Sequence, residues 1–370
     1  MTLRLKVKEI IRALEEAAPL ALQESYDNSG LIVGDPESEI SSLLLCIDLN
    51  EAVIEEAIQK GCGLIVSHHP IIFKGLKRLT PDGYVERVVI KAIRNGIAIA
   101  AMHTNLDNSH EGVNKKIADK LGLKSLSILE PKEGMLQKII TFIPESHAEV
   151  VRAAMFEAGA GQIGLYDACS FNVKGSGTFR AGAGASPFVG QMHQVHNEAE
   201  IKVEMIVPAY RASTVVKAML AAHPYEEVAW DLITLANRWN EAGSGMVGYL
   251  DEPLTEQDFL YHLQHVFGTP ALRHTELTGK LIRKVAVCGG SGSFLIKSAE
   301  RAHADAMITA DVKYHDFFDV MNKLLLIDAG HYETEQFTKE LMSDILTENF
   351  PNFAVLFSEV NTNPVRYYFK

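Results

Sequence analysis

The sequence predicts an α/β protein that is interrupted by a smaller α+β module. In the first and last parts of the chain, short continuous apolar runs alternate with segments of helically spaced apolar residues, which is typical of parallel strands covered on both faces. The middle part reads strand–helix–strand twice and contains a glycine-rich stretch from Gly175 to Gly190. We therefore expect a discontinuous outer domain over 1–131 and 237–370, with an inserted ferredoxin-like domain over 132–236.

The N-terminal part of the outer domain is predicted to alternate helices and strands. Three of its helical segments stop at Gly61, Gly96 and Gly122, and glycine favours the end of a helix. The strands are apolar runs between these segments. We expect helices over 6–17, 51–61, 84–96 and 110–122, and strands over 42–50, 63–70 and 97–107.

The remaining elements are predicted by the same periodicities. In the inserted module we expect strands over 138–144, 199–208 and 226–235, and helices over 147–159 and 212–223. In the C-terminal part we expect helices over 255–268, 294–304 and 333–346, and strands that begin the segments 284–293, 305–316 and 324–331.

Composition and charge exclude several classes of protein. The 370 residues include 35 Lys and Arg against 47 Asp and Glu, a formal charge of −12. An acidic surface repels phosphate groups, so binding to nucleic acid or to an anionic membrane is not expected. No apolar run reaches the roughly 18 residues of a membrane span, and the N-terminus lacks the pattern of a signal peptide. The four cysteines form no CxxC pair, so we expect a reduced, cytoplasmic protein without a cysteine zinc site.

Four motifs place polar side chains directly after a buried strand, where open parallel sheets bind ligands. The first is the pair His68 and His69. A turn at Pro70 could let both imidazoles converge, each on a different metal ion, although two hydrogen-bonded loop histidines would show the same pattern.

The second motif is HTNLD. Asp107 could bridge two metal ions, and His103 could ligate a metal or orient a ligand; helix capping or an Asx turn is the alternative for Asp107.

The third motif is HYETE, at the start of a predicted helix. His331 and Glu335 are four residues apart, so they share one helix face at about 5–6 Å between Cβ atoms and suit one metal cluster. Favourable charge at the helix N-terminus is the alternative for Glu335. The fourth motif is TADVKYHD, in which Asp311 and His315 could act as a base or bind substrate. Capping and a solvated helix face would explain this pair equally well.

Together these motifs offer three imidazoles and two carboxylates as candidate metal ligands. This donor set suits zinc, iron or manganese and is poor for calcium. Five protein ligands cannot saturate two ions, so open positions would remain for hydroxide or substrate. Two ions about 3.5–4 Å apart can activate water. The candidate ligands are His68, His69, Asp107, His331 and Glu335.

A glycine- and serine-rich segment between a strand and a helix is a candidate substrate-binding site. Its backbone amides and the helix N-terminus could hold a phosphate, although the segment fits neither common phosphate-loop pattern. A tight turn with an N-cap serine is the alternative. The candidate residues are Gly289, Gly290, Ser291, Gly292 and Ser293.

Five motifs in the same order, YDNSGL at 26–31, SHHP, HTNLD, TADVKYHD and GHYETE, resemble the Nif-three-like family, whose members are often called GTP cyclohydrolase 1 type 2. The resemblance covers 1–130 and about 240–370. It implies a two-lobed α/β domain that binds two metal ions between its lobes through the five candidate ligands. It also implies a PII-like or CutA-like insertion and a ring-shaped homohexamer. Ala310 is the departure, because shorter members have glycine there.

The sequence leaves two functions open. The first is a metal-dependent hydrolase acting on a nucleotide, in which metal-activated hydroxide would open the imidazole ring of a purine, with His103 or His315 as acid–base and Asp311 as a further candidate. No feature selects guanine over other substrates, and phosphoester or amide cleavage fits as well. The second is a non-enzymatic, metal-responsive regulator or scaffold whose inserted domain senses a small molecule or a partner.

Overall fold

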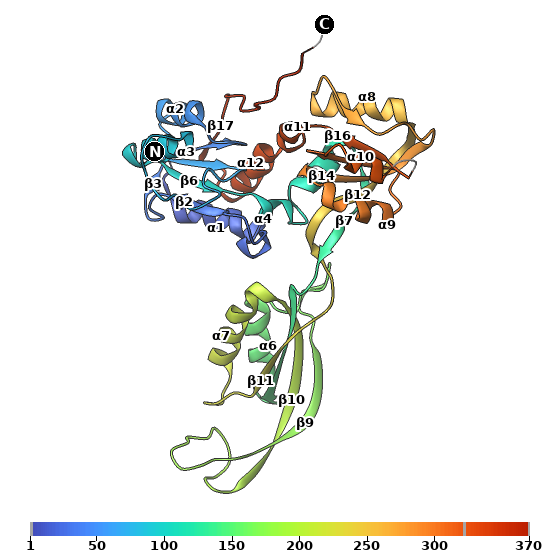
Figure 1. Cartoon of the computed structure of the whole chain (residues 1–370). Coiled ribbons are helices and arrows are strands. Elements are labelled where there is room, and N and C mark those ends of the chain that lie inside the picture. The colour runs from blue at the N-terminus through green and yellow to red at the C-terminus, as the bar shows by residue number, and fades with distance from the viewer. Residues whose placement is uncertain (1–2, 321–322, 369–370) are drawn as a thin grey trace. The chain divides into compact units, whose positions relative to one another are not determined.

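The chain divides into two compact units, each described by itself. In the computed structural model, which describes residues 3–320 and 323–368, one unit consists of Met1–Glu130 with Ala242–Lys370, and the other is Pro131–Glu241. We call these the outer unit and the middle unit. Helices and strands mix in both, so the structure is of the mixed α/β kind (Figure 1).

The first sheet of the outer unit has a parallel centre. Its strand order is β17-β4-β5-β6-β2, and β2 alone runs antiparallel to its neighbour. Buried residues alternate between the two faces, because Leu43 and Leu45 of β4 pack on one face and Leu44 on the other. The strands are β17 (Ala354–Phe357), β4 (Ser42–Cys46), β5 (Leu64–Ser67), β6 (Ala98–Ala101) and β2 (Gly30–Val33).

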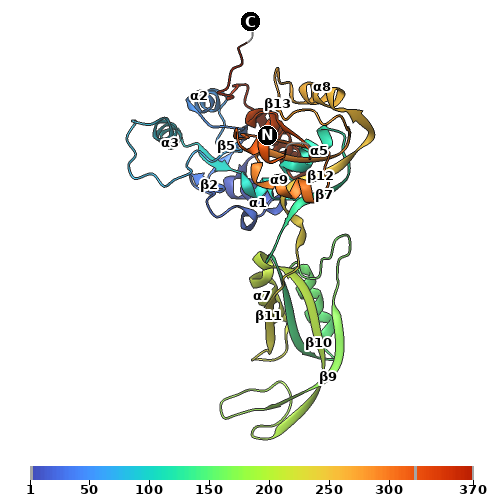
Figure 2. The same cartoon turned by 45° about the vertical axis from the view of Figure 1, so that its right-hand side comes forward.

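Helices cover both faces of this sheet, as continuous apolar strands require. The face that carries Leu44 is covered by α2 (Glu51–Gln59) and α3 (Tyr84–Arg94), which lie side by side (Figures 1 and 2). The opposite face is covered by α1 (Val7–Ala17) and α12 (Thr338–Asn349), and α5 (Val113–Lys120) packs against α12 in the same hydrophobic cluster. A small pair of strands, β1 (Leu5–Lys6) and β3 (Glu39–Ile40), and the short helices η1 (Leu20–Leu22) and α4 (Thr104–Asp107) complete this part.

The second sheet of the outer unit has the order β13-β16-β15-β14-β12-β7. Its centre is parallel across β14, β15 and β16, and β12 and β13 run antiparallel. One hydrophobic cluster contains residues of both sheets, including Leu64 and Ile308, so the two sheets share a core. The strands are β7 (Lys124–Lys132), β12 (Trp239–Thr255), β13 (Arg273–His274), β14 (Leu281–Ser291), β15 (Ala306–Ala310) and β16 (Leu325–Asp328); the helices are α8 (Glu256–Phe267), η3 (Ser293–Leu295), α9 (Ile296–Arg301), α10 (Asp316–Asp319) and α11 (His331–Glu335).

A buried carboxylate ties α8 to the loop that precedes β14. Glu256 is 5% exposed and accepts hydrogen bonds from the amide and hydroxyl of Thr278 and from the amide of Gly279, all at 2.8–2.9 Å. Burial alone would raise the pKa of Glu256, but these hydrogen bonds lower it below its ordinary value. The contact therefore depends on the ionised carboxylate.

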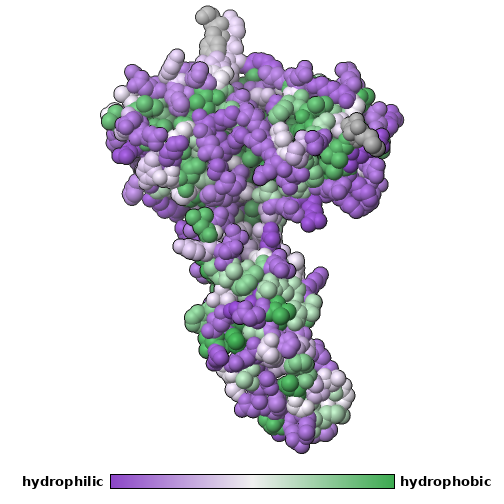
Figure 3. All heavy atoms as spheres, turned by 180° about the vertical axis from the view of Figure 1, so that it is seen from behind, coloured by the Kyte–Doolittle hydropathy of each residue, from purple (hydrophilic) through white to green (hydrophobic). Residues whose placement is uncertain are grey.

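The middle unit is a four-stranded antiparallel sheet with two helices on one face. The strand order is β11-β8-β10-β9, and the chain visits its elements in the order strand, helix, strand, strand, helix, strand. Helices α6 and α7 pack against the sheet through a separate hydrophobic cluster (Figure 1). Apolar side chains such as Phe171 and Val173 remain exposed elsewhere in the unit, and Figure 3 shows apolar atoms on its surface. The elements are β8 (Leu136–Pro144), α6 (Ala148–Glu157), β9 (Phe171–Arg180), β10 (Val195–Pro208), η2 (Ala209–Arg211), α7 (Ala212–Ala222) and β11 (Trp230–Thr234).

Several boundaries differ from the sequence prediction. The strand expected over 97–107 ends at Ala101, and α4 follows it. The single helix expected over 333–346 is two helices, α11 and α12. The long strand β12 was not predicted, because glycine and proline are unfavourable inside strands; its one proline, Pro253, lies in an irregularity of the pairing between Tyr249 and Leu254. The strand β14 continues to Ser291 through the two glycines where a turn was expected.

Two further expectations from composition can be compared with the structure. Within residues 3–320 and 323–368, no helix combines the length and apolar character that a membrane crossing requires. All four cysteines are free thiols, and Cys46, Cys62 and Cys288 are buried. Burial raises the pKa of the Cys46 and Cys288 thiols, so both are neutral near pH 7.

Candidate metal centre

Two adjacent histidines lie at the carboxyl end of β5. The turn after Ser67 brings the ring centroids of His68 and His69 to 4.9 Å, with 44° between the ring planes. The His68 side chain is fully buried, and that of His69 is 19% exposed. The two imidazoles therefore face one region, whereas neighbours along a regular strand would point to opposite faces.

Three side chains from other segments meet these imidazoles. His331 and Glu335 share one face of α11, with 3.1 Å between Nε2 and Oε2. The Oε2 atom of Glu335 lies 3.0 Å from His69 Nε2, and its Oε1 atom lies 3.6 Å from His68 Nε2. Asp107, the last residue of α4, brings Oδ1 to 3.7 Å from His68 Nε2. The structure thus brings together all five candidate ligands.

Each imidazole of this group is held through its Nδ1 atom. An oxygen that can only accept faces each Nδ1, so Nδ1 carries the N–H and a neutral ring presents its lone pair at Nε2. The bonds run from His68 to the Met102 carbonyl (2.8 Å), from His69 to Asp48 (2.8 Å) and from His331 to Asp311 (2.6 Å).

The Nε2 lone pairs therefore converge on a carboxylate, with no donor between them. Within the described residues, His68 Nε2 and Glu335 Oε2 are buried without a hydrogen-bond partner. The Nε2 atoms of His69 and His331 are only 3.2 Å apart. Buried acceptors that face one another cost free energy unless a cation lies between them. That cation is either a proton or a metal ion.

In the absence of metal, protons satisfy the group. Burial alone would lower the pKa of His69, but hydrogen bonds to Asp48 and Glu335 raise it to about 10. Burial alone would also lower the pKa of His331, but its contacts with Glu335 and Asp311 raise it to about 9. Although burial favours the neutral acid, the neighbouring imidazoles lower the pKa of Glu335. A metal ion would compete with these protons, so its binding would release them.

The spacing of the donor atoms fits a metal ion. Ligands held at about 2.0–2.2 Å lie about 3.0–3.5 Å from one another in tetrahedral or octahedral sites. The pairs of donor atoms given above are 3.0–3.7 Å apart, and His68, His69 and Glu335 form a mutually close triad. Because the two oxygens of Glu335 face different imidazoles, Glu335 spans the group. Asp107, expected to be able to bridge two ions, faces His68.

A fourth imidazole lies beside the group. The ring of His103 is 5.4 Å from that of His68 and 5.3 Å from that of His69, and its side chain is 12% exposed. Its Nδ1 donates to Asp27 Oδ1 at 2.7 Å. Asp27 is buried and also accepts from the amide and hydroxyl of Thr104. Burial opposes ionisation, but these bonds lower the pKa of Asp27, so a carboxylate orients His103.

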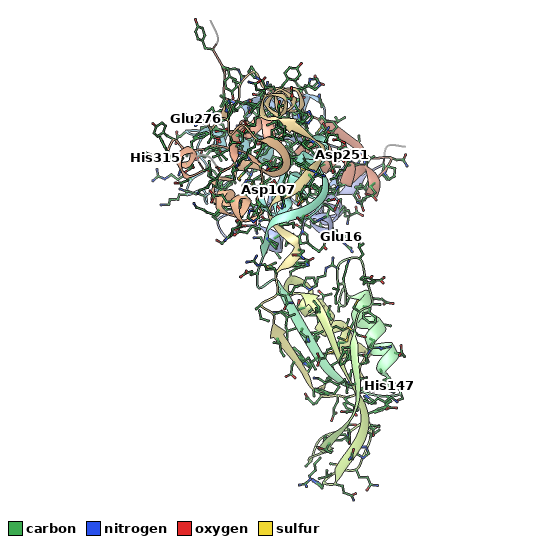
Figure 4. The ribbon with its side chains drawn as sticks, turned by 90° about the vertical axis from the view of Figure 1, so that its right-hand side faces the viewer. Glu16, Asp107, His147, Asp251, Glu276 and His315 are labelled. Carbon is green, nitrogen blue, oxygen red and sulfur yellow. The ribbon has the colours of Figure 1, made fainter. Side chains whose placement is uncertain are left out.

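The candidate pair Asp311 and His315 separates in the structure. Asp311 adopts φ 54° and α10 begins only at Asp316, so the two residues do not share a helix face. Asp311 supports His331 from behind. His315 is exposed, its ring contacts are Tyr314 and Phe318, and it lies at the margin of the outer unit, away from Asp107 (Figure 4). This placement argues against His315 as an acid–base.

Three amides of the glycine- and serine-rich segment are bound to side chains of the fold. The amide of Gly289 donates to Asn114, that of Gly290 to Thr334 and that of Gly292 to Thr309, at 2.8–3.0 Å. Of the predicted phosphate cradle over Gly290, Ser291, Gly292 and Ser293, the amides of Gly290 and Gly292 are thus already used within the fold. Gly290 instead makes room for the centre, since a Cβ atom there would lie 2.2 Å from Glu335 Oε1.

Sequence reasoning missed two carboxylates of the centre. Asp48 follows β4 and supports His69, and the Thr362 hydroxyl donates to its second oxygen at 3.0 Å. Its position directly after a buried strand is the signal that could have found it. Asp27 lies in the YDNSGL motif, which carries part of the family resemblance but was not predicted to contribute a site residue. Its contact with His103 joins residues 76 positions apart, so local spacing could not reveal it.

Comparison with known proteins agrees with this architecture. The model of the Duf34/NIF3 (NGG1p interacting factor 3) family matches residues 5–364. The chain belongs to this family. Its relatives include the protein named GTP cyclohydrolase 1 type 2 homolog from Halalkalibacterium halodurans, 39% identical over 360 residues (96% of this chain, 97% of the relative). The Bacillus subtilis protein of the same name is 36% identical over 363 residues, with the same coverage.

Solved structures of the Duf34/NIF3 family share the fold. A Bacillus cereus protein related to NIF3 has a TM-score of 0.85 and 35% identity, covering 98% of this chain and 99% of that one. A Staphylococcus aureus protein has a TM-score of 0.78 and 30% identity, with the same coverage. The resemblance expected from the five motifs is thereby confirmed.

Proposed function

We propose that this member of the Duf34/NIF3 family is a dinuclear metal-dependent hydrolase that acts on a nucleotide. The observation that carries the proposal is the convergence of three Nε2 lone pairs on the carboxylate of Glu335, with no donor between them. A buried set of imidazole and carboxylate acceptors is suited to a divalent cation.

The five candidate ligands divide into two groups that share Glu335. One ion would be held by His68, Asp107 and Oε1 of Glu335, and the other by His69, His331 and Oε2 of Glu335. The donor set favours zinc, with iron or manganese as alternatives. When bound, such ions lower the pKa of water and stabilise the oxygens of a displacement.

The residues around the centre supply proton transfer. Asp27 holds the N–H of His103 at Nδ1, so Nε2 of His103 is the atom free to accept a proton from the attacking water. The same atom can return that proton to the leaving nitrogen or oxygen, which balances the hydrolysis. Phe73 packs edge-on against the His103 ring at 5.4 Å and limits its rotation.

The nucleotide is proposed from the names of the relatives. Two curated relatives are named GTP cyclohydrolase 1 type 2 homolog, and opening the imidazole ring of GTP is a hydrolysis of the kind that this centre could support. Phosphoester cleavage would use the same centre. A substrate panel must therefore contain GTP, other nucleotides and simple phosphoesters.

The test combines metal content with turnover. Protein purified without added metal is subjected to elemental analysis, and the metal-loaded protein is assayed on the panel. We expect about two ions per chain, and a loss of both metal and turnover in Glu335→Gln. Glu348→Gln, the same substitution at an exposed position of α12, is the control and should retain both. Absence of bound metal, or turnover that survives Glu335→Gln, would refute the proposal.

The second candidate function is a non-enzymatic, metal-responsive regulator or scaffold. The observation that favours it is the middle unit, which has its own hydrophobic core and contains none of the five candidate ligands. We propose that this unit is a ferredoxin-like, PII-like insertion. A metal-loaded protein that binds two ions, turns over nothing on the panel and binds an effector in a metal-dependent way would favour this function.

We also propose a cytoplasmic homohexamer, as the family resemblance implies. Its mass in solution, measured by light scattering on the full chain, should be six times 40.8 kDa. A stable monomer or dimer at micromolar concentration would exclude that assembly.

A further inference from the structure

The middle unit contains a cavity of about 680 Å³ whose lining includes none of the five candidate metal ligands. Small-molecule sites in proteins enclose about 300–1,000 Å³ and combine apolar walls with a few polar groups. This cavity is bounded by β9, β10 and the loops that follow β9 and α7. Its size and its mixed walls are those of a ligand site.

A nearly buried carboxylate forms part of the cavity wall. Glu200 of β10 is 8% exposed, and its Oε1 accepts a hydrogen bond of 2.9 Å from the hydroxyl of Tyr225. No described residue donates to its other oxygen. That oxygen faces Gly177, where an added Cβ atom would lie 2.0 Å away. A carboxylate oxygen that receives no hydrogen bond, on a side chain that is nearly buried in the cavity wall, favours a ligand that donates one.

Hydrogen bonds hold the loop that carries Tyr225, whose hydroxyl donates to Glu200. The amide of Tyr225 donates to His223 Nδ1 at 3.1 Å, and Nε2 of the same imidazole donates to the carbonyl of Phe142 at 3.0 Å. His223 is buried, and because burial disfavours its charged form the pKa is lowered, consistent with a neutral ring that accepts and donates at once. The loop that carries Tyr225 is therefore anchored to β8 before any ligand arrives.

Aromatic rings provide the apolar walls. The ring centroids of Phe179 and Phe188 lie 6.1 and 6.2 Å from that of Tyr225, at 59° and 49° to its plane. Flat aromatic ligands pack favourably against tilted rings of this kind. The loop that carries Phe188 is closed onto the cavity, since the amide of Ser186 donates to Glu226 at 2.8 Å.

The cations of the cavity are largely engaged. Lys174 forms an ion pair with Glu145 at 3.2 Å, and Lys202 forms one with Glu204 at 2.6 Å. Arg180 is the third cation of the cavity lining, and it is exposed to solvent. The buried charge of the cavity is thus negative, which favours a cationic or N–H-donating ligand over an anion.

We infer that this cavity binds a flat aromatic or heteroaromatic molecule that presents an amine or amidine group to Glu200. The ring would lie among Tyr225, Phe179 and Phe188, and its N–H groups would donate to Oε2 of Glu200. Gly177 would provide the space for this contact. The inference does not depend on hydrolysis at the metal centre, because no candidate metal ligand lines the cavity.

Two isosteric probes of opposite charge test the inference on the full-length protein. Titration calorimetry compares 2-naphthamidine with 2-naphthoate. We expect one 2-naphthamidine per chain, bound at least tenfold more tightly than 2-naphthoate, a difference of about 1.4 kcal/mol. Equal or tighter binding of 2-naphthoate, or no binding of either probe at millimolar concentration, would overturn the inference.

Variants locate the binding. Glu200→Gln keeps an acceptor for Tyr225 but removes the charge, and we expect it to weaken 2-naphthamidine at least tenfold. Gly177→Ala should do the same by displacing the carboxylate, which protects the test if the first variant folds poorly. Glu157→Gln, the same substitution at an exposed position of α6 outside the cavity, is the matched control and should stay within twofold. Glu335→Gln should leave binding unchanged. Loss of binding there, or full binding in Glu200→Gln, would refute the assignment.

Discussion

The carboxylate of Asp48 offers the sharpest test of how the metal centre is built. Among the five candidate ligands, its hydrogen-bond partner is His69, whose Nδ1 donates to it at 2.8 Å. In Asp48→Asn the amide oxygen can still accept that hydrogen bond, so ring orientation is kept while the charge is removed; the amide nitrogen takes the place of the oxygen that accepts from Thr362, whose hydroxyl can turn to accept from it. The substitution therefore separates electrostatic support of the ligand from its positioning.

The expected magnitude follows from the type of hydrogen bond. Bonds to charged groups contribute about 1.5–3 kcal/mol and neutral ones about 0.5–1.5 kcal/mol. The Asp48 side chain is 39% exposed, so solvent screens part of the difference. We expect a loss of about 1.4 kcal/mol in zinc binding, which is about a tenfold weaker Kd.

Calorimetric titration of zinc into chelator-stripped protein measures this change. The ion held by His69 and His331 should weaken tenfold, while the ion held by His68 and Asp107 should be nearly unaffected. Asp344→Asn removes a carboxylate that is 67% exposed in a surface ion pair and controls for net charge. A Kd within twofold of the parent in Asp48→Asn, or an equal loss in the control, would refute the reasoning.

Two further predictions concern the frame of the outer unit. Gly290→Ala should displace Glu335 and lower the zinc content measured by elemental analysis. The reason is that Gly290 has φ +59° and that the new Cβ atom would lie 2.2 Å from Glu335 Oε1. Gly75→Ala is the control and should retain the metal, because a Cβ atom there meets nothing within 4 Å. Glu256→Gln should lower the free energy of unfolding in urea by about 1.5–3 kcal/mol at pH 7, unlike the exposed control Glu252→Gln. The folded pKa of Glu256 lies below the unfolded value of about 4.3, so its contribution is present above that pH and is lost as pH falls through the folded pKa. Equal metal content in the two glycine variants, or a deficit of Glu256→Gln that persists at low pH, would contradict these predictions.

The candidate ligands were predictable because each follows a local rule. His68 and His69 follow a buried strand, and strand ends are where parallel sheets bind ligands. His331 and Glu335 are one helical turn apart, and their 3.1 Å contact confirms the shared face. The order of helices and strands was predictable for the same reason, because burial of one or both faces of an element sets the spacing of apolar residues along the sequence.

The roles of several side chains depended on contacts that periodicity does not encode. Asp311 and His315 share no helix face, because Asp311 adopts φ 54° and α10 begins only at Asp316. In the glycine-rich segment, Asn114 and Thr309 accept hydrogen bonds from the amides of Gly289 and Gly292, which no local pattern predicted. Such partners come from distant strands and helices, and only folding brings them into hydrogen-bond distance.

By itself, the sequence determined that the chain is α/β, that imidazoles and carboxylates follow its buried strands, and that it resembles the Duf34/NIF3 family. Only the tertiary structure decided that the two oxygens of Glu335 face different imidazoles, and that Asp27 and Asp48 hold imidazoles through Nδ1. It also decided that Glu200 faces an aromatic cavity. The physical reason is that local patterns record burial and turn geometry, whereas the direction of a lone pair is set by partners dozens of residues away.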